Sequence, residues 1–405
     1  MPFASVLPGS LVLGPMTKGS NLPFRQLCIE QGAQVLVSEM VVARRLKQKR
    51  RSEFALIRRA PGEPCFGVQL AGNKPDELAW AAALVEARGA DFVDLNLGCP
   101  IDHFTRMGLG AALGRQVTRV RRIVEAMTAV VKVPVTVKIR LGWNASSLNY
   151  LELAKAIVDG GAAALTVHGR TREARYRQPA DWSAIAEVAA AVPIPVIGNG
   201  DLMFPHEVHE RLSTTGCAAV MSARGALIKP WLFREVTTEY WDITAEERVA
   251  IYRRYVELAT QHWGRRPEKA HEASPEHPES ADIRHVAITD DSSESIVSSA
   301  AELEDNNGPQ RRVLDDHGRE RVREFLRWHV GFWVRYAPQH TDGTWPTMQQ
   351  RESSFVPRSP LEALLARHDD VAVDYITDQL LDGGDLGAPP PPGETESEPA
   401  VTAAG

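Results

Sequence analysis

Four reactive or charged side chains stand near the ends of short apolar runs in this chain of 405 residues. Cys99 follows the run Phe92–Asn96 and lies between a glycine and a proline, which fix its backbone. Lys138, His168 and Arg224 close or follow later runs. A thiol can donate a proton, and a lysine or arginine can hold an anion. Alone, Cys99 could equally be a structural core cysteine and His168 a hydrogen-bonded histidine at a strand end.

Eight such apolar runs alternate with stretches of helical periodicity. The strands and helices that these runs and stretches predict must position the four side chains. Glycines at 32, 89, 161 and 216 mark helix ends, because glycine accepts the left-handed conformation there. The pattern predicts a (β/α)₈ TIM barrel; an open doubly wound sheet is the alternative, but Gly14–Gly19 does not carry its glycine fingerprint. The expected strands are Leu11–Gly14, Val35–Ser38, Cys65–Leu70, Phe92–Asn96, Pro134–Arg140, Ala163–His168, Ile194–Gly198 and Ala218–Ser222.

Two glycine-rich segments, Gly198–Asp201 and Ala223–Gly225, follow the seventh and eighth expected strands. Barrels often bind a phosphate at this place with backbone N–H groups and a short helix N-terminus. Each segment alone could be a plain tight turn. On neighbouring strands they predict a phosphate site, with Arg224 supplying a charged hydrogen-bond donor.

The character of the chain changes after residue 240. Ala245–His262 and Arg319–Tyr336 have the periodicity of amphipathic helices, and Pro360–Leu381 of one or two more. We therefore predict an α/β barrel domain at 1–240 and a C-terminal helical domain at 241–382. Residues 265–318 are expected to be a disordered insertion, and 383–405 a disordered tail.

Charge is unevenly distributed along the chain, whose net charge is −6. Residues 265–320 hold 7 basic against 14 acidic residues, and residues 382–405 hold 5 acidic and no basic ones. The remainder carries a net charge of +6. An electropositive folded part is compatible with a nucleic-acid partner.

The four cysteines are far apart and form no Cys-x-x-Cys pair. Neither a zinc site nor a disulfide framework is expected, which suits a reducing cytoplasm. No apolar run is long enough to span a membrane, and no signal-peptide pattern opens the sequence. We expect a cytoplasmic protein without a metal.

Seven short blocks occur in the order found in the tRNA-dihydrouridine synthases, and the chain resembles that family over roughly residues 10–260. The blocks are Gly14–Thr17, Gly67–Leu70, Asn96–Pro100, Val137–Arg140, His168–Glu173, Gly198–Asp201 and Ala223–Gly225. Three further blocks, Asn21–Arg25, Lys229–Phe233 and His262–Gly264, are most similar to the branch that modifies position 47 in the tRNA variable loop.

The resemblance implies reduction of a tRNA uridine by FMN, with NAD(P)H as electron donor. Cys99 would be the proton donor, because a thiol with an ordinary pKa is mostly protonated at neutral pH. Lys138 would contact the flavin ring edge, and Gln69 would hydrogen-bond a pyrimidine-like ring. The cofactor-binding residues are expected to be Pro15, Met16, Thr17, Gln69, Asn96, Lys138, His168, Asn199, Gly200, Asp201, Ala223, Arg224 and Gly225.

Basic residues crowd the segment from 44 to 59, after the second expected strand. Such a run is often only a solvated helix face, but here it follows a strand end on the side where barrels bind substrates. We expect RNA contacts from Arg45, Lys49, Arg50, Arg170 and Arg323 in a monomeric protein. A flavoenzyme of dihydroorotate dehydrogenase type and a non-catalytic RNA-binding barrel are the rival interpretations.

Overall fold

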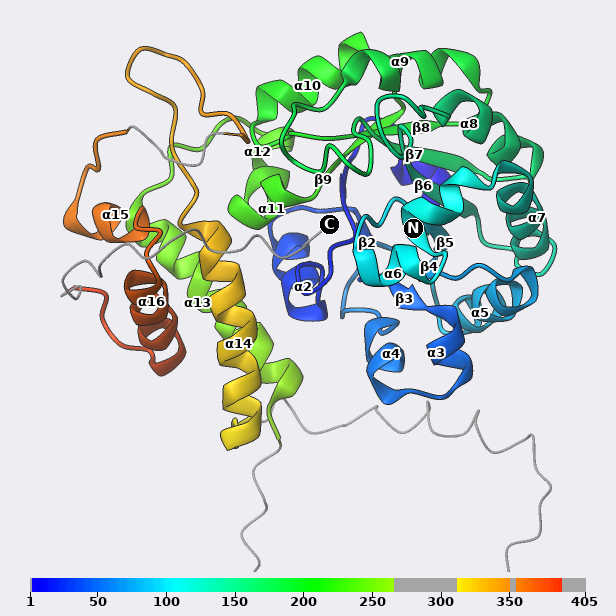
Figure 1. The fold of residues 1–405 in the computed structure, drawn as a ribbon. Helices are drawn as coiled ribbons and strands as arrows, with labels where there is room; N and C mark the ends of the chain where they lie inside the picture. Colours follow the sequence, from blue (N-terminus) through cyan, green and yellow to red (C-terminus); the bar gives the residue numbers. More distant parts are fainter. Residues whose placement is uncertain (1, 266–311, 350–354, 388–405) are drawn as a thin grey trace, which may run out of the picture.

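The computed structural model describes residues 2–265, 312–349 and 355–387. Its centre is a closed barrel of eight parallel strands, which Figure 1 shows surrounded by helices. The barrel strands are β1 (Leu11–Leu13), β2 (Val35–Val37), β4 (Cys65–Ala71), β5 (Phe92–Leu97), β6 (Val135–Arg140), β7 (Ala164–His168), β8 (Val196–Asn199) and β9 (Ala219–Ser222).

Two pairings close the sheet. β1 lies between β2 and β9, and β2 also pairs with β4, so the ring has no free edge. The two-residue β3 (Val41–Val42) pairs with the last two residues of β4. It extends the sheet beyond the carboxyl end of β2. The predicted TIM barrel is therefore confirmed, and the open doubly wound sheet is not.

Helices connect successive strands around the outside of the barrel. The glycines at 32, 89, 161 and 216 all have positive φ, as the expected helix stops require. The connecting helices are α2 (Leu22–Glu30), α3 (Ala43–Lys47), α4 (Arg51–Leu56), α5 (Pro75–Ala87), α6 (Asp102–Arg106), the 3₁₀ helix η1 (Gly110–Arg115), α7 (Val117–Thr128), α8 (Tyr150–Asp159), α9 (Trp182–Ala191), α10 (Pro205–Thr214), α11 (Arg224–Ile228) and α12 (Leu232–Thr237).

The barrel interior near the amino ends of the strands is apolar, and α1 (Phe3–Val6) covers this end of the barrel. The rings of Phe3 and Phe92 lie 4.5 Å apart between their centroids. Toward the carboxyl ends of the strands the interior becomes polar, with Gln69, Asp94 and Thr136 all buried. Polar groups in a barrel interior need internal partners, so this upper layer can hold side chains in fixed positions.

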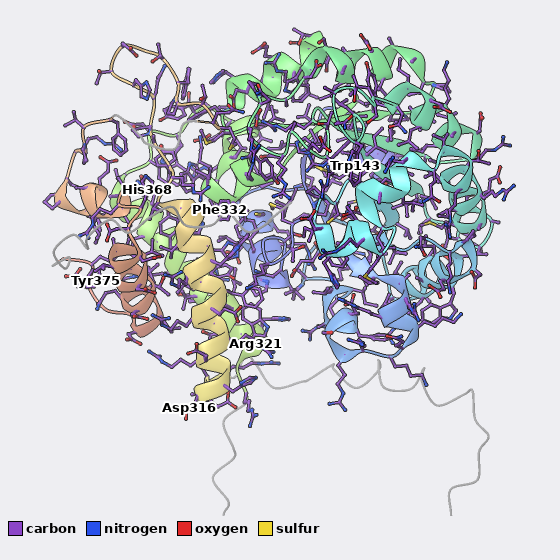
Figure 2. All side chains as sticks on the ribbon, viewed as in Figure 1. Trp143, Asp316, Arg321, Phe332, His368 and Tyr375 are labelled. Atoms are coloured by element: carbon purple, nitrogen blue, oxygen red, sulfur yellow. The ribbon has the colours of Figure 1, made fainter. Side chains whose placement is uncertain are left out.

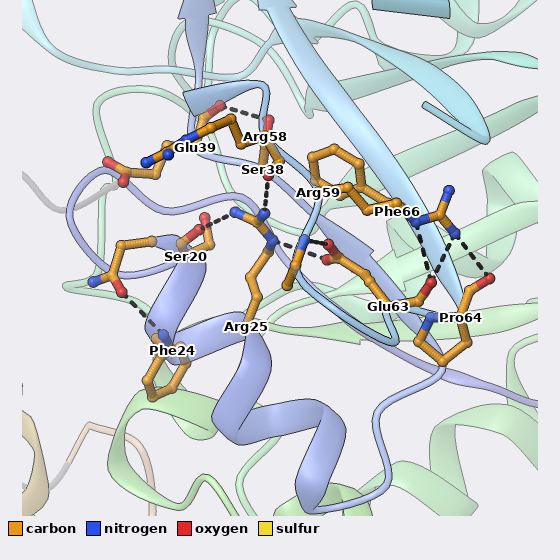
Figure 3. Close-up of polar contacts among 12 residues, drawn as sticks. Ser20, Phe24, Arg25, Ser38, Glu39, Arg58, Arg59, Glu63, Pro64 and Phe66 are labelled. Carbon is orange, nitrogen blue, oxygen red and sulfur yellow. Dashed lines mark hydrogen bonds and ion pairs between the residues drawn. The ribbon is translucent and has the colours of Figure 1, made fainter. Parts of the chain in front are cut away.

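A buried arginine ties α2 to the loop after α4, as Figure 3 shows. Arg25 donates through Nε to Glu63 Oε1 at 2.9 Å and through Nη2 to the carbonyl oxygen of Arg58 at 2.7 Å. Glu63 also accepts the backbone N–H of Ala60. Because a charged pair this deeply buried is costly to break, it fixes the loop that carries the second half of the basic segment.

Four helices form the C-terminal region: α13 (Ala245–Trp263), α14 (Asp316–Trp333), α15 (Pro360–Leu365) and α16 (Asp370–Asp382). They pack beside α2 and α11 in Figure 1. Asn21, at the start of α2, contacts Tyr255 Oη at 3.3 Å and His329 Nε2 at 3.2 Å. The helical region thus rests directly on the first βα unit of the barrel.

Two predicted boundaries in this region are wrong. α14 begins at Asp316, capped by Asp315, and Arg265 pairs with Val313 in an antiparallel bridge, so the expected insertion is too wide at both ends. At the other end, Leu386 is buried in the core and the Gly384 carbonyl accepts from Arg253, so the expected tail starts too early. The rest of both predictions, 266–311 and 388–405, lies outside the described residues.

The described ranges contain no helix long and apolar enough to cross a membrane, and no cluster of three metal-binding side chains. All four cysteines fall within these ranges, where they are buried thiols and form no disulfide.

Candidate active site

A pocket lies at the carboxyl ends of the barrel strands and gathers most of the residues that the sequence singled out. Its walls include these predicted positions: Pro15, Met16, Asn96, Cys99, Lys138, His168, Arg170, Asn199, Gly200, Asp201, Ala223, Arg224 and Gly225. Residues from six different strands and the loops that follow them thus meet in one place. Such convergence is typical of TIM-barrel active sites.

The Cys99 loop is held by a chain of amides inside the barrel. Asn96 Oδ1 accepts the backbone N–H groups of Gly98 at 3.1 Å and Cys99 at 2.9 Å. Asn96 Nδ2 donates to Gln69 Oε1 at 2.7 Å, and Gln69 in turn donates to Asp94 at 2.8 Å. The thiol is therefore positioned through backbone bonds that begin deep in the barrel.

Gln69 is not among the residues that line the pocket, and its contact with a ring there stays a prediction. Both ends of its amide are engaged by Asn96 and Asp94. Thr17 is likewise absent from the pocket walls.

A glycine at position 110 lets η1 approach the thiol loop closely. Gly110 has φ +58°, and a β-carbon there would lie 2.7 Å from the Cys99 carbonyl oxygen. That carbonyl accepts the N–H of Ala111 at 3.0 Å. A side chain at 110 would be strained and would push the Cys99 loop away.

Burial raises the pKa of the Cys99 thiol, while a backbone hydrogen bond from Ile101 and the charge of Arg140 oppose this shift. Only 3% of Cys99 is exposed. The thiol is consequently protonated at neutral pH and suited to donate a proton rather than to attack as a thiolate.

The pocket floor is electropositive. Lys138 donates through Nζ to Asn199 Oδ1 at 3.0 Å, and Asn199 is fixed by its own bond to the Met221 carbonyl at 2.9 Å. Burial, followed by the charge of Arg140, lowers the pKa of Lys138 to about 7, although Asp94 opposes this. Burial and the surrounding cations also lower the pKa of His168 well below its usual value, so His168 is neutral.

Arg140, which the sequence analysis did not single out, links two active-site loops. Its Nε donates to the Gly98 carbonyl at 2.7 Å and its Nη1 to the Thr171 carbonyl at 3.2 Å. The side chain thereby holds the cysteine loop against the loop after β7. Its place at the end of the block Val137–Arg140 was the only signal in the sequence.

A second linkage between the same loops runs through Arg172, which pairs with Asp102 of α6. The guanidinium of Arg172 also lies 4.6 Å from the ring centroid of Trp143, a cation–π distance. Figure 2 shows Trp143 on the barrel side of the molecule. Charged and aromatic contacts thus continue from the pocket rim outward.

At the opposite side of the pocket, Asp201 joins two arginines. Arg170 Nη2 lies 2.5 Å and Arg224 Nη2 3.2 Å from the Asp201 carboxylate. Arg224 also stacks on Tyr176, with 3.8 Å between guanidinium carbon and ring centroid. Gly225 must be glycine, because a β-carbon would lie 1.8 Å from the Leu202 carbonyl oxygen. Two cations and one carboxylate leave a surplus positive charge beside the glycine-rich strand ends.

Residues 11–286 match the family described as Dihydrouridine synthase (Dus). The chain belongs to the dihydrouridine synthase family. A human relative named tRNA-dihydrouridine(47) synthase [NAD(P)(+)]-like is 44% identical over 259 residues, and a Coprinopsis cinerea relative named tRNA-dihydrouridine(47) synthase [NAD(P)(+)] is 40% identical over 272 residues. Each match covers 63% of this chain and 40% of the relative, so the chain spans less than half the length of these relatives.

Two of the predicted RNA-binding arginines, Arg170 and Arg323, form ion pairs with other parts of the chain. Arg170 is 2% exposed and also donates to the Gln178 carbonyl at 2.7 Å, so it is part of the pocket wall. Arg323 pairs with Asp374 and Asp378, which join α14 to α16. The Arg323 side chain is still 33% exposed, so an RNA contact from it stays a prediction.

The basic segment is partly engaged and partly free for contact. Arg58 contacts His262 and Arg59 pairs with Asp91, whereas Arg45 pairs with the buried Glu53. Lys49 and Arg50 are exposed between α3 and α4. These two remain as candidates for RNA contact.

A second hollow lies on the outside of the barrel between the N-terminal ends of α7 and α8, and it shares no residue with the mouth pocket. It is lined by Pro75, Arg115, Gln116, Val117, Thr118, Arg119, Arg122, Ser147, Leu148, Asn149 and Glu152. It contains no thiol and no buried cation, so the chemistry of the site belongs to the mouth pocket.

Proposed function

We propose that this protein reduces a uridine of tRNA to 5,6-dihydrouridine, using FMN and NAD(P)H. The observation that carries the proposal is the pairing of a protonated thiol, Cys99, with the cation of Lys138 in one pocket at the barrel mouth. The relatives' names, which specify tRNA position 47 and NAD(P)(+), support the substrate class and the electron donor.

The residues present suit an anionic flavin. Among the described residues, two carboxylates, Asp94 and Asp201, lie near four cations, so this part of the pocket has a positive surplus. The cations are Lys138, Arg140, Arg170 and Arg224. In our proposal Lys138 faces the flavin ring edge, and Arg224 with the loops at Gly200 and Gly225 holds the phosphate. Pro15 and Met16 would contact the ring system, and His168, Asn199 and Ala223 would complete the wall of the site.

Bound FMN in its reduced form supplies a hydride to one carbon of the uracil C5=C6 bond. In our proposal Cys99 donates the proton that completes the neighbouring carbon, and solvent later reprotonates the thiolate. Asn96 and Arg140 keep the thiol at that carbon through the backbone of Gly98 and Cys99. Lys138 favours the negative charge that develops beside it during turnover.

The chain is proposed to act as a cytoplasmic monomer in which residues 1–240 carry the flavin. The helical domain, 241–382, would contact tRNA together with Lys49 and Arg50. The basic surface and this appended domain favour a macromolecular substrate over a free pyrimidine.

The test is oxidation of the reduced, FMN-loaded protein by different substrates. We expect tRNA lacking dihydrouridine to reoxidise the bound flavin anaerobically and to gain dihydrouridine, whereas orotate, uracil and uridine do not. Reoxidation by orotate would favour the dihydroorotate dehydrogenase type. A protein that binds tRNA but takes up no flavin would be a non-catalytic RNA-binding barrel.

A further inference from the structure

Residues 334–349, which follow α14, leave the helical region and return to the barrel. Figure 1 shows this stretch as an orange loop that rises from α14 and comes back beside α12. Its tryptophan, Trp345, packs among three aromatic rings of the barrel part, with centroid distances of 4.6 Å to Phe204, 4.6 Å to His206 and 4.8 Å to Tyr240. We call residues 345–349 the return segment.

The ring cluster that receives Trp345 has a rigid base. Lys229 and Glu235 are fully buried and their charged atoms lie 2.5 Å apart. The ammonium of Lys229 also lies 4.5 Å from the centroid of Phe204 and 5.2 Å from that of Tyr240. Because breaking such a buried pair is costly, the aromatic rings above it hold a fixed place, and so does Trp345.

From this anchor the return segment reaches the mouth pocket. Met348 forms part of the pocket wall, and Gln349 Nε2 donates to Asp201 Oδ2 at 2.7 Å. Asp201 is the carboxylate that joins Arg170 and Arg224, and it also accepts the N–H of Ala180 at 2.8 Å. Of the donors that reach Asp201 in the described residues, Gln349 alone comes from beyond the barrel.

We propose that Gln349 is a positioning residue of the cofactor site and acts through Asp201 on the arginines at its phosphate end. A glutamine satisfies the carboxylate without adding charge, so the positive surplus of Arg170 and Arg224 stays available for a phosphate. The proposal rests on the proposed FMN dependence. The return segment lies outside residues 11–286, so the family match does not account for it.

The test compares two flavins that differ only in the phosphate. Apoprotein is titrated with FMN and with riboflavin, following the quenching of flavin fluorescence. We expect Gln349→Glu to weaken FMN binding roughly tenfold or more, because the new carboxylate repels both Asp201 and the phosphate. Riboflavin binding should change less than about twofold, since the ring end of the pocket is untouched.

The matched control is Gln339→Glu, which makes the same change in the same connection between α14 and α15. Its side-chain amide donates to the Gly343 carbonyl at 2.8 Å, away from the pocket, so both flavins should bind as in the parent protein. A second variant, Trp345→Ala, should speed FMN release by freeing the segment, and Trp345→Phe should largely restore the slow rate.

Unchanged FMN binding in Gln349→Glu, or an equal loss of FMN and riboflavin, would overturn the proposal. Those outcomes would leave a preference of the parent protein for FMN intact, and with it the proposed function. A parent protein that binds both flavins equally would lack the phosphate site altogether, and both proposals would fail.

Discussion

At the scale of single residues, the pocket separates a proton donor from a group of cations. Burial raises the pKa of the Cys99 thiol, whereas it lowers the pKa of Lys138 to about 7. Cys99 lies in the loop that follows β5, and Lys138 lies on the neighbouring β6, where it pairs in register with Asn96 of β5. Because Cys99 is proposed to donate a proton and Lys138 to hold a positive charge, each leads to a prediction of its own.

Cys99→Ala should retain flavin and its reduction by NAD(P)H but make little dihydrouridine. Removing only the proton donor should slow the step with tRNA by about 10²–10⁴-fold, the usual contribution of general acid catalysis. Rapid mixing of the reduced enzyme with tRNA measures this step directly. If flavin reoxidation by tRNA proceeds at the parent rate, Cys99 is structural.

Lys138 should make FMN affinity depend on pH. Its pKa of about 7 in the free protein will rise when the negatively charged ring of reduced FMN lies beside it, so binding of reduced FMN takes up a proton above pH 7. The affinity for reduced FMN, measured anaerobically, should therefore fall as pH rises from about 7 to 9, by up to roughly tenfold per pH unit. Titrations of Lys138→Met provide the comparison, since the variant should bind more weakly and lose this slope. Parallel pH profiles for the two proteins would contradict the assignment.

At the scale of elements, α3 and α4 present the exposed part of the basic segment just after the carboxyl end of β3. Arg45 is tied to Glu53, whose other oxygen accepts the N–H of Val42. Reversing the charge at Arg45 would disturb the fold locally. Lys49 and Arg50 can be changed without such a loss.

Reversing Lys49 and Arg50 to glutamate should weaken tRNA binding and leave flavin content unchanged. Each lost phosphate contact should reduce the slope of log affinity against log salt by about one unit. Filter binding at several salt concentrations measures the slope. The control reverses Lys132 and Lys155, two exposed lysines on other parts of the barrel surface. Equal slopes in both variants would mean that the segment is only a solvated face.

At the scale of the whole molecule, the helical region and barrel share one continuous core. The residues that flank the stretch 266–311 lie next to each other, because Arg265 and Val313 exchange backbone hydrogen bonds at 2.9 and 3.0 Å. Figure 2 shows Asp316 and Arg321 at the adjacent end of α14. A short connection can therefore replace the stretch without moving either helix.

Replacing residues 266–311 by a short Gly/Ser linker should preserve the melting temperature and activity. Closing a loop of about fifty residues costs only about 1–2 kcal/mol more than closing a short one, so the change should be neutral or slightly stabilising. If the acidic stretch competes with tRNA for the basic surface, the deletion will tighten tRNA binding most at low salt. Thermal unfolding and tRNA titration measure both effects. A fall of many degrees would show that the stretch is packed against the rest.

The sequence alone determined the barrel and most of its pocket, because local signals carry both. Alternating apolar runs, glycine helix stops and short polar blocks at strand ends are properties of neighbouring residues, and a parallel barrel gathers all its strand ends at one face. Cys99, Lys138 and Arg224 could therefore be predicted as neighbours although they are far apart in the chain.

Only the tertiary structure decided which polar groups are already engaged and which distant segments reach the pocket. Gln69 and Arg323 looked available in the sequence, but their partners lie on other elements. Gln349 reaches Asp201 across 148 positions of sequence, and no local pattern announces that contact. Side-chain pairing and the docking of Trp345 depend on the packed arrangement in space, which neither periodicity nor spacing encodes.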